Sequence, residues 1–248
     1  MPVGDREPIF NVPWPVLALL GLMIAVHVSR LFLTEDQGYW VLAALAFIPA
    51  RYSEAAGALP GGEVAKATSF ITHLFLHADK IHLAVNGAWL LAFGTPLAKR
   101  LGWARFMLFT VGCGVAGAAT FLALHPGLMA PVIGASGAIA GLMGGVMRLL
   151  FPALDSHEGH LLSDDPQQIH ALPLVAALRD KRVLMSSAAF IALNVLAMFG
   201  LGSPTDSGAI AWEAHLGGYF FGLLCFGFFD VAAPDTSPTS REPPSETR

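Results

Sequence analysis

Long runs of apolar residues, separated by polar segments, are the feature that most constrains how this chain of 248 residues can fold. Six such runs come close to or reach the length of about 20 residues that a helix needs to cross a bilayer core about 30 Å thick. Charged residues make up only 13% of the chain, against about 25% in an ordinary soluble domain. The chain has too little charge to cover a water-exposed surface of its size, which predicts a membrane protein.

The predicted fold class is an all-α membrane protein built as one bundle of six transmembrane helices. The spans are expected at about residues 14–33, 82–98, 103–124, 132–151, 183–201 and 209–231. Residues 1–13 form an N-terminal segment, and residues 232–248, rich in Pro, Ser, Thr and Glu, are expected to be a disordered tail. A polar stretch at 152–182 separates two spans, and an apolar patch at 39–48 is expected to be an interfacial or partly embedded loop.

The positive charges indicate how the chain is inserted. An even number of spans places both termini on one side, and Lys and Arg are enriched on the cytoplasmic side of a membrane. Of the 14 Lys and Arg residues, ten lie on the side of the termini: Arg6, Lys99, Arg100, Arg105, Arg148, Arg179, Lys181, Arg182, Arg241 and Arg248. The other four are Arg30, Arg51, Lys66 and Lys80. We therefore expect a multi-pass protein of the plasma membrane with both termini in the cytoplasm.

Charge and cysteine content exclude several classes of function. The formal net charge of -4 provides no basic surface for nucleic acid. The two cysteines, Cys113 and Cys225, lie in apolar runs and form neither a disulfide framework nor a Cys-x-x-Cys metal or redox pair.

Four polar residues within the predicted spans are the candidate functional residues, because a polar group inside a membrane is costly. Ser136 lies about four residues into the fourth span, and His215 about six residues into the sixth. His82 and Asn86 lie one turn apart in the second span. All three spans enter from the outer face, so these side chains are expected in one layer within roughly 10 Å of depth. Such a shared depth favours a common site.

Small residues predict how the serine and the histidine could meet. The fourth and sixth spans each carry a small-x-x-x-small face, which lets helix backbones approach closely. The faces are Gly137-x-x-x-Gly141 and Gly218-x-x-x-Gly222. Packing them together would bring the Ser136 hydroxyl near the His215 imidazole, and a serine needs a base within about 2.6–3.2 Å to become a nucleophile.

Several short motifs lie in these spans or at their ends. They are Gly134-Ala135-Ser136-Gly137, Ala214-His215-Leu216-Gly217-Gly218 with Gly222, His82-x-x-x-Asn86, the lead-in His73-x-x-x-His77-x-x-x-x-His82, and Arg100-Leu101-Gly102. Over about residues 14–231 the chain resembles the rhomboid family of intramembrane serine proteases. The resemblance implies a rhomboid-like bundle of the prokaryotic six-helix type.

The resemblance also implies an activity, which is cleavage of single-span membrane proteins near the outer face by a Ser–His dyad without an acid. Ser136 would be the nucleophile and His215 the general base. No cofactor and no metal are implied, and the expected partners are the substrate helices and the lipid bilayer. Ala140 stands where many members carry an aromatic residue that stacks on the histidine, so His215 must be oriented in another way.

An oxyanion hole is implied beside the serine. The backbone N–H of Ser136 and the side chains of His82 and Asn86 would bind the developing negative charge, while Gly134 and Gly137 would leave room for the substrate backbone. Elementary physics favours the same arrangement, because the free N–H groups and the dipole of a first helical turn attract negative charge.

Two other functions stay open at this stage. One is an inactive rhomboid-like protein that binds transmembrane helices, although such relatives typically lack the serine or the histidine. The other is a metal or proton transporter that uses the imidazoles of His73, His77 and His82 as ligands. Transporters place their sites near the midplane in repeated, broken helices, which are not evident here, and packing of His73 and His77 is favoured over ligation.

Overall fold

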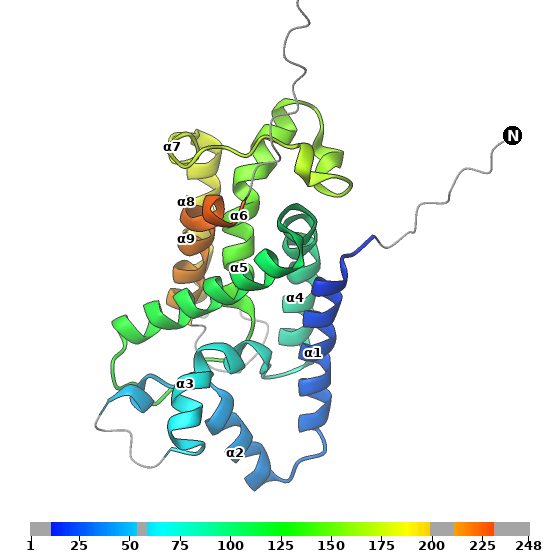
Figure 1. Ribbon diagram of the computed structural model, residues 1–248. Helices are drawn as coiled ribbons and strands as arrows, with labels where there is room; N and C mark the ends of the chain where they lie inside the picture. The colour runs from blue at the N-terminus through cyan, green and yellow to red at the C-terminus, as the bar shows by residue number, and fades with distance from the viewer. Residues whose placement is uncertain (1–10, 54–58, 199–210, 231–248) are drawn as a thin grey trace, which may run out of the picture.

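The computed structural model describes residues 11–53, 59–198 and 211–230, and within these ranges the chain is helical (Figure 1). The α-helices are α1 (Trp14–Arg30), α2 (Glu35–Leu45), α3 (Gly62–Thr72), α4 (Lys80–Trp89), α5 (Thr95–Leu124), α6 (Ser136–Asp155), α7 (Leu174–Ala177), α8 (Lys181–Met198) and α9 (Trp212–Phe229). Short turns of 3₁₀ helix and one π-helical turn, η4 (Leu90–Gly94), complete the described elements. An isolated bridge between Phe47 and Val132 is the closest approach to a strand in the described part. The all-α prediction is confirmed for these residues.

The predicted spans fall on helices whose ends are shifted. α6 begins at Ser136 rather than at 132, because Val132 is held in the bridge: its N–H donates to the Phe47 carbonyl at 2.8 Å and its carbonyl accepts from the Phe47 N–H at 3.1 Å. Ser136 is therefore the first helical residue and not the fifth. The predicted tail 232–248 and most of the segment 1–13 lie outside the described residues.

The second and third predicted spans are joined without a loop. α4, η4 and α5 follow one another directly, and the break between the spans lies inside α5 at Gly102, with φ 71° and ψ 164°. Glycine has no Cβ and adopts a positive φ at little cost, so the chain changes direction here. The Arg100-Leu101-Gly102 motif therefore marks a sharp corner between two helical segments.

The prediction of a loop at 39–48 is wrong, because most of this segment belongs to helix α2. A capping box starts the helix: the Thr34 hydroxyl accepts from the Gln37 N–H at 3.4 Å, and the Gln37 side chain accepts from the Thr34 N–H at 3.1 Å. Glu35 and Asp36 in the first turn add favourable charge at the helix N-terminus. The local capping signal decided the structure where hydropathy alone suggested a loop.

The centre of the molecule is a close contact between α6 and α9, with α5 packed on both (Figure 1). A Cβ atom added to Gly218 would collide with the Gly137 carbonyl, and one added to Gly222 would collide with the Gly141 carbonyl. The two helices are therefore in backbone contact through the small faces expected from the sequence, and that prediction is confirmed.

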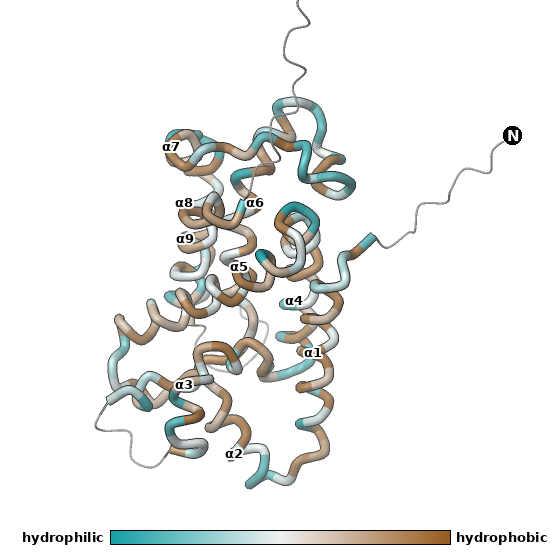
Figure 2. The backbone as a smooth tube through the Cα atoms, viewed as in Figure 1, coloured by the Kyte–Doolittle hydropathy of each residue, from teal (hydrophilic) through white to brown (hydrophobic). Residues whose placement is uncertain are grey.

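Two stretches of the described chain are long and apolar enough to cross a membrane by length and composition. They are Lys80–Leu124, which the corner at Gly102 divides, and Ser136–Asp155. α1 is a shorter apolar helix. Figure 2 shows hydrophobic residues along the helices and more hydrophilic ones in the connection from α6 to α7.

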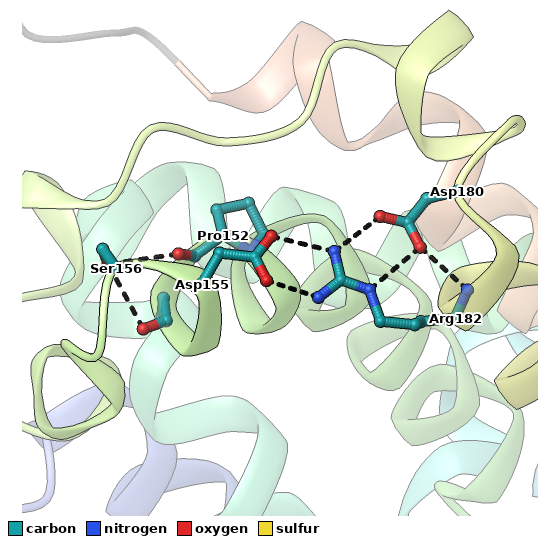
Figure 3. A network of polar contacts seen from close by, with 6 residues as sticks. Pro152, Asp155, Ser156, Asp180 and Arg182 are labelled. Atoms are coloured by element: carbon teal, nitrogen blue, oxygen red, sulfur yellow. Dashed lines mark hydrogen bonds and ion pairs between the residues drawn. The ribbon is translucent and has the colours of Figure 1, made fainter.

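That connection and α7 lead to the start of α8, where an arginine ties two helices together (Figure 3). Arg182 in α8 donates to both carboxylate oxygens of Asp155 in α6, at 2.5 and 2.9 Å, and also to Asp180 at 2.8 Å. The hydrogen bonds that Asp180 accepts from Arg182 hold the pKa of Asp180 down to about 2. The guanidinium also lies over the ring of Phe151, 4.9 Å from its centroid.

A second arginine joins the same connection to the corner at Gly102 inside α5. Arg100 pairs with Asp230, at 2.7 Å from Nε to Oδ1, and its Nη1 donates to the carbonyls of Pro166, Gln167 and Ile169. Both side chains of the ion pair are largely buried. The polar stretch at 152–182 thus has a defined structure and contacts the ends of neighbouring helices. It lies at the end of the molecule opposite α2 and α3 (Figure 1).

Candidate active site

Ser136 opens α6 and lies at a helix N-terminus with free amide groups. Its predecessor Ala135 is the N-cap residue and contributes no side-chain hydrogen bond. Within the described part of the chain, the N–H of Ser136 donates to no acceptor, whereas the N–H of Ile139 is already bonded to the Ala135 carbonyl at 2.9 Å. A first-turn N–H beside the Ser136 hydroxyl is therefore available for a negatively charged ligand atom.

The structure brings Ser136 and His215 together. The Ser136 Oγ lies 2.7 Å from His215 Nε2, which is a good hydrogen-bond distance. His215 lies in the first turn of α9, not six residues into a longer helix as the predicted span implied. The backbone contact between α6 and α9 fixes these two helix starts relative to each other.

A third polar residue, Asn194, lies at the other ring nitrogen of His215. His215 Nδ1 lies 2.7 Å from Oδ1 of Asn194 in α8, and Asn194 Nδ2 donates to the Phe190 carbonyl at 2.8 Å. The donor to Phe190 must be the amide nitrogen, so the oxygen of Asn194 faces His215 and can only accept. This arrangement assigns the ring hydrogen to Nδ1 and leaves the Nε2 lone pair facing Ser136.

The sequence reasoning missed Asn194. Its signal was present, because it is a lone amide among apolar residues in the fifth predicted span, and such residues are functional candidates by default. In the structure Asn194 is 8% exposed.

His82 and Asn86 lie on α4 beside the loop that leads to Ser136. Gly134 has φ +109°, and a Cβ atom there would lie 2.7 Å from His82 Nε2 and 3.7 Å from Asn86 Nδ2. Asn86 is buried, and its amide donates to the His82 carbonyl at 3.1 Å, which leaves its second N–H for another partner. Gly134 is therefore needed where the loop passes these two side chains.

The start of α4 is fixed by a strong cap. The Asp79 carboxylate accepts from the N–H groups of Ile81 and His82, each at 2.8 Å. The bond from the His82 N–H, together with that from Ile81, holds the pKa of Asp79 below its usual range. The cap fixes the helical register that turns His82 toward Gly134.

Gly137 lies on the other side of Ser136. A Cβ atom there would lie 3.3 Å from the Ala214 carbonyl, so Gly137 packs against α9. The role in substrate binding assigned to it from the sequence stays a prediction.

The other two histidines of the lead-in have packing contacts. The His73 ring is buried and its Nδ1 lies 2.8 Å from the Ser69 carbonyl, while the His73 carbonyl accepts from the Gly134 N–H at 2.9 Å. His77 is fully buried and packs edge-on against His82, with ring centroids 5.1 Å apart. Within the described ranges, no group of three or more His, Cys, Asp or Glu side chains is placed to hold a metal ion.

Fold and site together define a helical protein with apolar segments long enough to span a membrane and a serine–histidine pair between two of its helices. The chain belongs to the rhomboid family, since the family model described as Rhomboid domain matches residues 64–231. It is 29% identical over 220 residues to "Rhomboid protein 1, mitochondrial" of Saccharomyces cerevisiae, a match that covers 86% of this chain and 52% of that relative.

A second relative is "Putative rhomboid protease YdcA" of Bacillus subtilis. It is 40% identical over 74 residues, which covers 30% of this chain and 37% of that protein. The chain thus spans about half, or less, of the length of the curated relatives it matches. The recognition made from the sequence motifs is confirmed at the level of the family.

Proposed function

We propose that this protein is an intramembrane serine endopeptidase in which Ser136 and His215 form the catalytic dyad. The observation that carries the proposal is the 2.7 Å contact between the Ser136 hydroxyl and His215 Nε2. Membership of a membrane-embedded family known for serine proteases supports it.

The proposed reaction begins when Ser136 Oγ attacks the carbonyl carbon of the scissile peptide bond. The hydroxyl proton passes to His215 Nε2, whose lone pair faces it. His215 then gives this proton to the leaving nitrogen as the carbon–nitrogen bond breaks, leaving an ester on Ser136. Water, deprotonated by the same Nε2, hydrolyses the ester and restores the serine.

The developing oxyanion would lie at the start of α6. The free N–H of Ser136 is the first donor, and the side chains of His82 and Asn86, which line the adjacent Gly134 loop, are the second and third. Losing one such donor typically costs about 10²–10³ in rate.

The proposed setting is a six-span bundle in the plasma membrane with both termini in the cytoplasm and the dyad near the outer face. The charge distribution of the sequence supports this orientation. The proposed substrates are single-span membrane proteins that unwind near their outer end, because a peptide bond inside a helix is shielded from attack.

The test is cleavage of a single-span reporter protein in liposomes. Ser136→Ala and His215→Ala should each abolish cleavage. Ser29→Ala is the matched control because, among the described residues, the exposed Ser29 hydroxyl bonds only the Val26 carbonyl of its own helix. Cleavage retained by either dyad variant would refute the dyad. Absence of cleavage by the wild type, with binding of the reporter, would favour an inactive relative that binds transmembrane helices.

A further inference from the structure

We propose that Asn194 is a positioning residue that orients the His215 imidazole for proton transfer, a role that rests on the proposed function. Asn194 Oδ1 lies 2.7 Å from His215 Nδ1, on the side of the ring opposite Ser136. Within the described residues, the side chain of Asn194 bonds His215 and the Phe190 carbonyl and not Ser136, so its effect would pass through the histidine.

The direction of the Asn194 amide is fixed by its second contact. Its nitrogen donates to the Phe190 carbonyl at 2.8 Å, one turn earlier in α8, so its oxygen cannot exchange places with its nitrogen without losing that bond. A fixed acceptor at Nδ1 holds the hydrogen on that nitrogen and keeps Nε2 as a base. It also fixes the ring plane, which a single bond to the Ser136 hydroxyl would leave free to rotate.

In the part of the chain that the structure describes, Asn194 and Ser136 are the hydrogen-bond partners of the His215 ring, so the ring depends on Asn194 for its orientation at Nδ1. Ala140, one turn after Ser136 in α6, has only a methyl side chain and cannot stack on a ring. Among the described residues, no aromatic ring pairs with His215, whereas other histidines of the chain do have such pairs. Two hydrogen bonds, one at each ring nitrogen, therefore define the orientation of the imidazole.

An amide suits this position better than a carboxylate. Asn194 is 8% exposed, and a buried negative charge carries a large desolvation cost. A neutral acceptor can still orient the ring without that cost. The trio Ser136–His215–Asn194 thus has the connectivity of a serine-protease triad with a neutral third member.

α8 itself holds Asn194 in place through one stripe of residues that faces α9. Val183, Ser187 and Phe190 precede Asn194 on this stripe, at helical spacing. The Ser187 hydroxyl lies 2.7 Å from the Tyr219 hydroxyl, and the Phe190 ring stacks on Tyr219 with centroids 4.7 Å apart. Ser187 provides a matched control, since it also bonds α9 from this stripe but does not touch His215.

The experiment compares Asn194→Leu, Asn194→Asp and Ser187→Ala in full-length protein reconstituted in liposomes with the cleavable reporter. Asn194→Leu keeps the shape but removes the acceptor, so kcat should fall about 10–100-fold while KM changes less than about twofold. Asn194→Asp keeps an acceptor but places a charge at a buried position, so its kcat should lie between that of the wild type and that of Asn194→Leu. Ser187→Ala should keep kcat within about twofold of the wild type.

Several results would overturn the proposal. One is a kcat for Asn194→Leu within twofold of the wild type; another is an equal loss in Ser187→Ala, which would indicate docking of α8 alone. A third is Asn194→Asp falling to the level of Asn194→Leu while thermal unfolding shows both proteins folded. If Asn194→Leu does not fold, the kcat of Asn194→Asp is compared with that of Ser187→Ala. This comparison distinguishes positioning of His215 from docking of α8. Failure of the proposed function is distinct, because wild type and Ser136→Ala would then be equally inactive.

Discussion

The helix that carries His215 has two very different neighbours. On one side α9 meets α6 in backbone contact, where Gly218 and Gly222 leave no space for a side chain. On the other side α9 meets α8 through side chains, chiefly the Ser187–Tyr219 bond, the Phe190–Tyr219 stack and the Asn194–His215 bond. The first contact leaves no room for a larger residue at either glycine, whereas the second consists of a few side-chain interactions that can be removed one at a time.

This difference separates two requirements of the proposed dyad. The distance between serine and histidine is set by the rigid α6–α9 contact, because both residues lie at the starts of these helices. The orientation of the imidazole is set from α8, through Asn194. Changes at the two contacts should therefore have effects of different size and kind.

The largest effect is expected from Gly222→Ala. Its Cβ would collide with the Gly141 carbonyl, and a backbone atom cannot rotate away, so α9 must move from α6. We expect a loss of about 3 kcal/mol or more in stability, together with loss of reporter cleavage. The measurement is thermal unfolding in detergent.

Gly38→Ala is the control for this substitution. Gly38 lies in helix α2, and no heavy atom lies within 4 Å of the place that an alanine Cβ would take, so alanine should leave stability unchanged or raise it by up to about 1 kcal/mol. Equal melting temperatures for the Gly222 and Gly38 variants would contradict the account of the α6–α9 contact.

A smaller effect is expected from Tyr219→Phe on the other face of α9. The ring keeps its stack on Phe190 and loses only the bond to Ser187, whose hydroxyl still lies 2.7 Å from the Val183 carbonyl. The expected cost is about 0.5–1.5 kcal/mol. A double-mutant cycle with Ser187→Ala measures the coupling, and a coupling near zero would remove this bond from the α8–α9 contact.

The smallest effect, and the one that depends on pH, is expected from Arg182→Gln at the start of α8. Because Arg182 holds the pKa of Asp180 at about 2, below its unfolded value, this contact stabilises the fold above the unfolded pKa and is lost as pH falls toward 2. The wild type should melt higher than the variant near pH 6, and the difference should shrink between about pH 4 and pH 2. A difference that is constant across this range would exclude the ion pair as its cause.

The sequence allowed much of the site to be predicted, for identifiable reasons. Ser136 and His215 could be paired because the glycine faces beside them determine which helices pack, and a glycine face has few other uses in an apolar span. Asn194 could not be assigned a partner, because hydropathy does not define the rotation of α8 about its axis.

The helix ends were less predictable than the pairing. The start of α6 depends on the bridge between Phe47 and Val132, residues far apart in the chain, so no local pattern indicates it. α2 had a local signal, the Thr34–Gln37 capping box, which the apolar composition of the following residues concealed. The shift at α6 moved Ser136 by about one helical turn toward the start of its helix and left its pairing with His215 unchanged, whereas α2 carries none of the site residues.

The measurement that tests the central claim most directly is covalent labelling of Ser136 by a fluorophosphonate probe in liposomes. The account predicts that wild type is labelled at one residue, identified as Ser136 by mass spectrometry, and that Ser136→Ala and His215→Ala are not labelled. Equal labelling of wild type and Ser136→Ala would contradict the assignment of the nucleophile, and undiminished labelling of His215→Ala would contradict the assignment of the base.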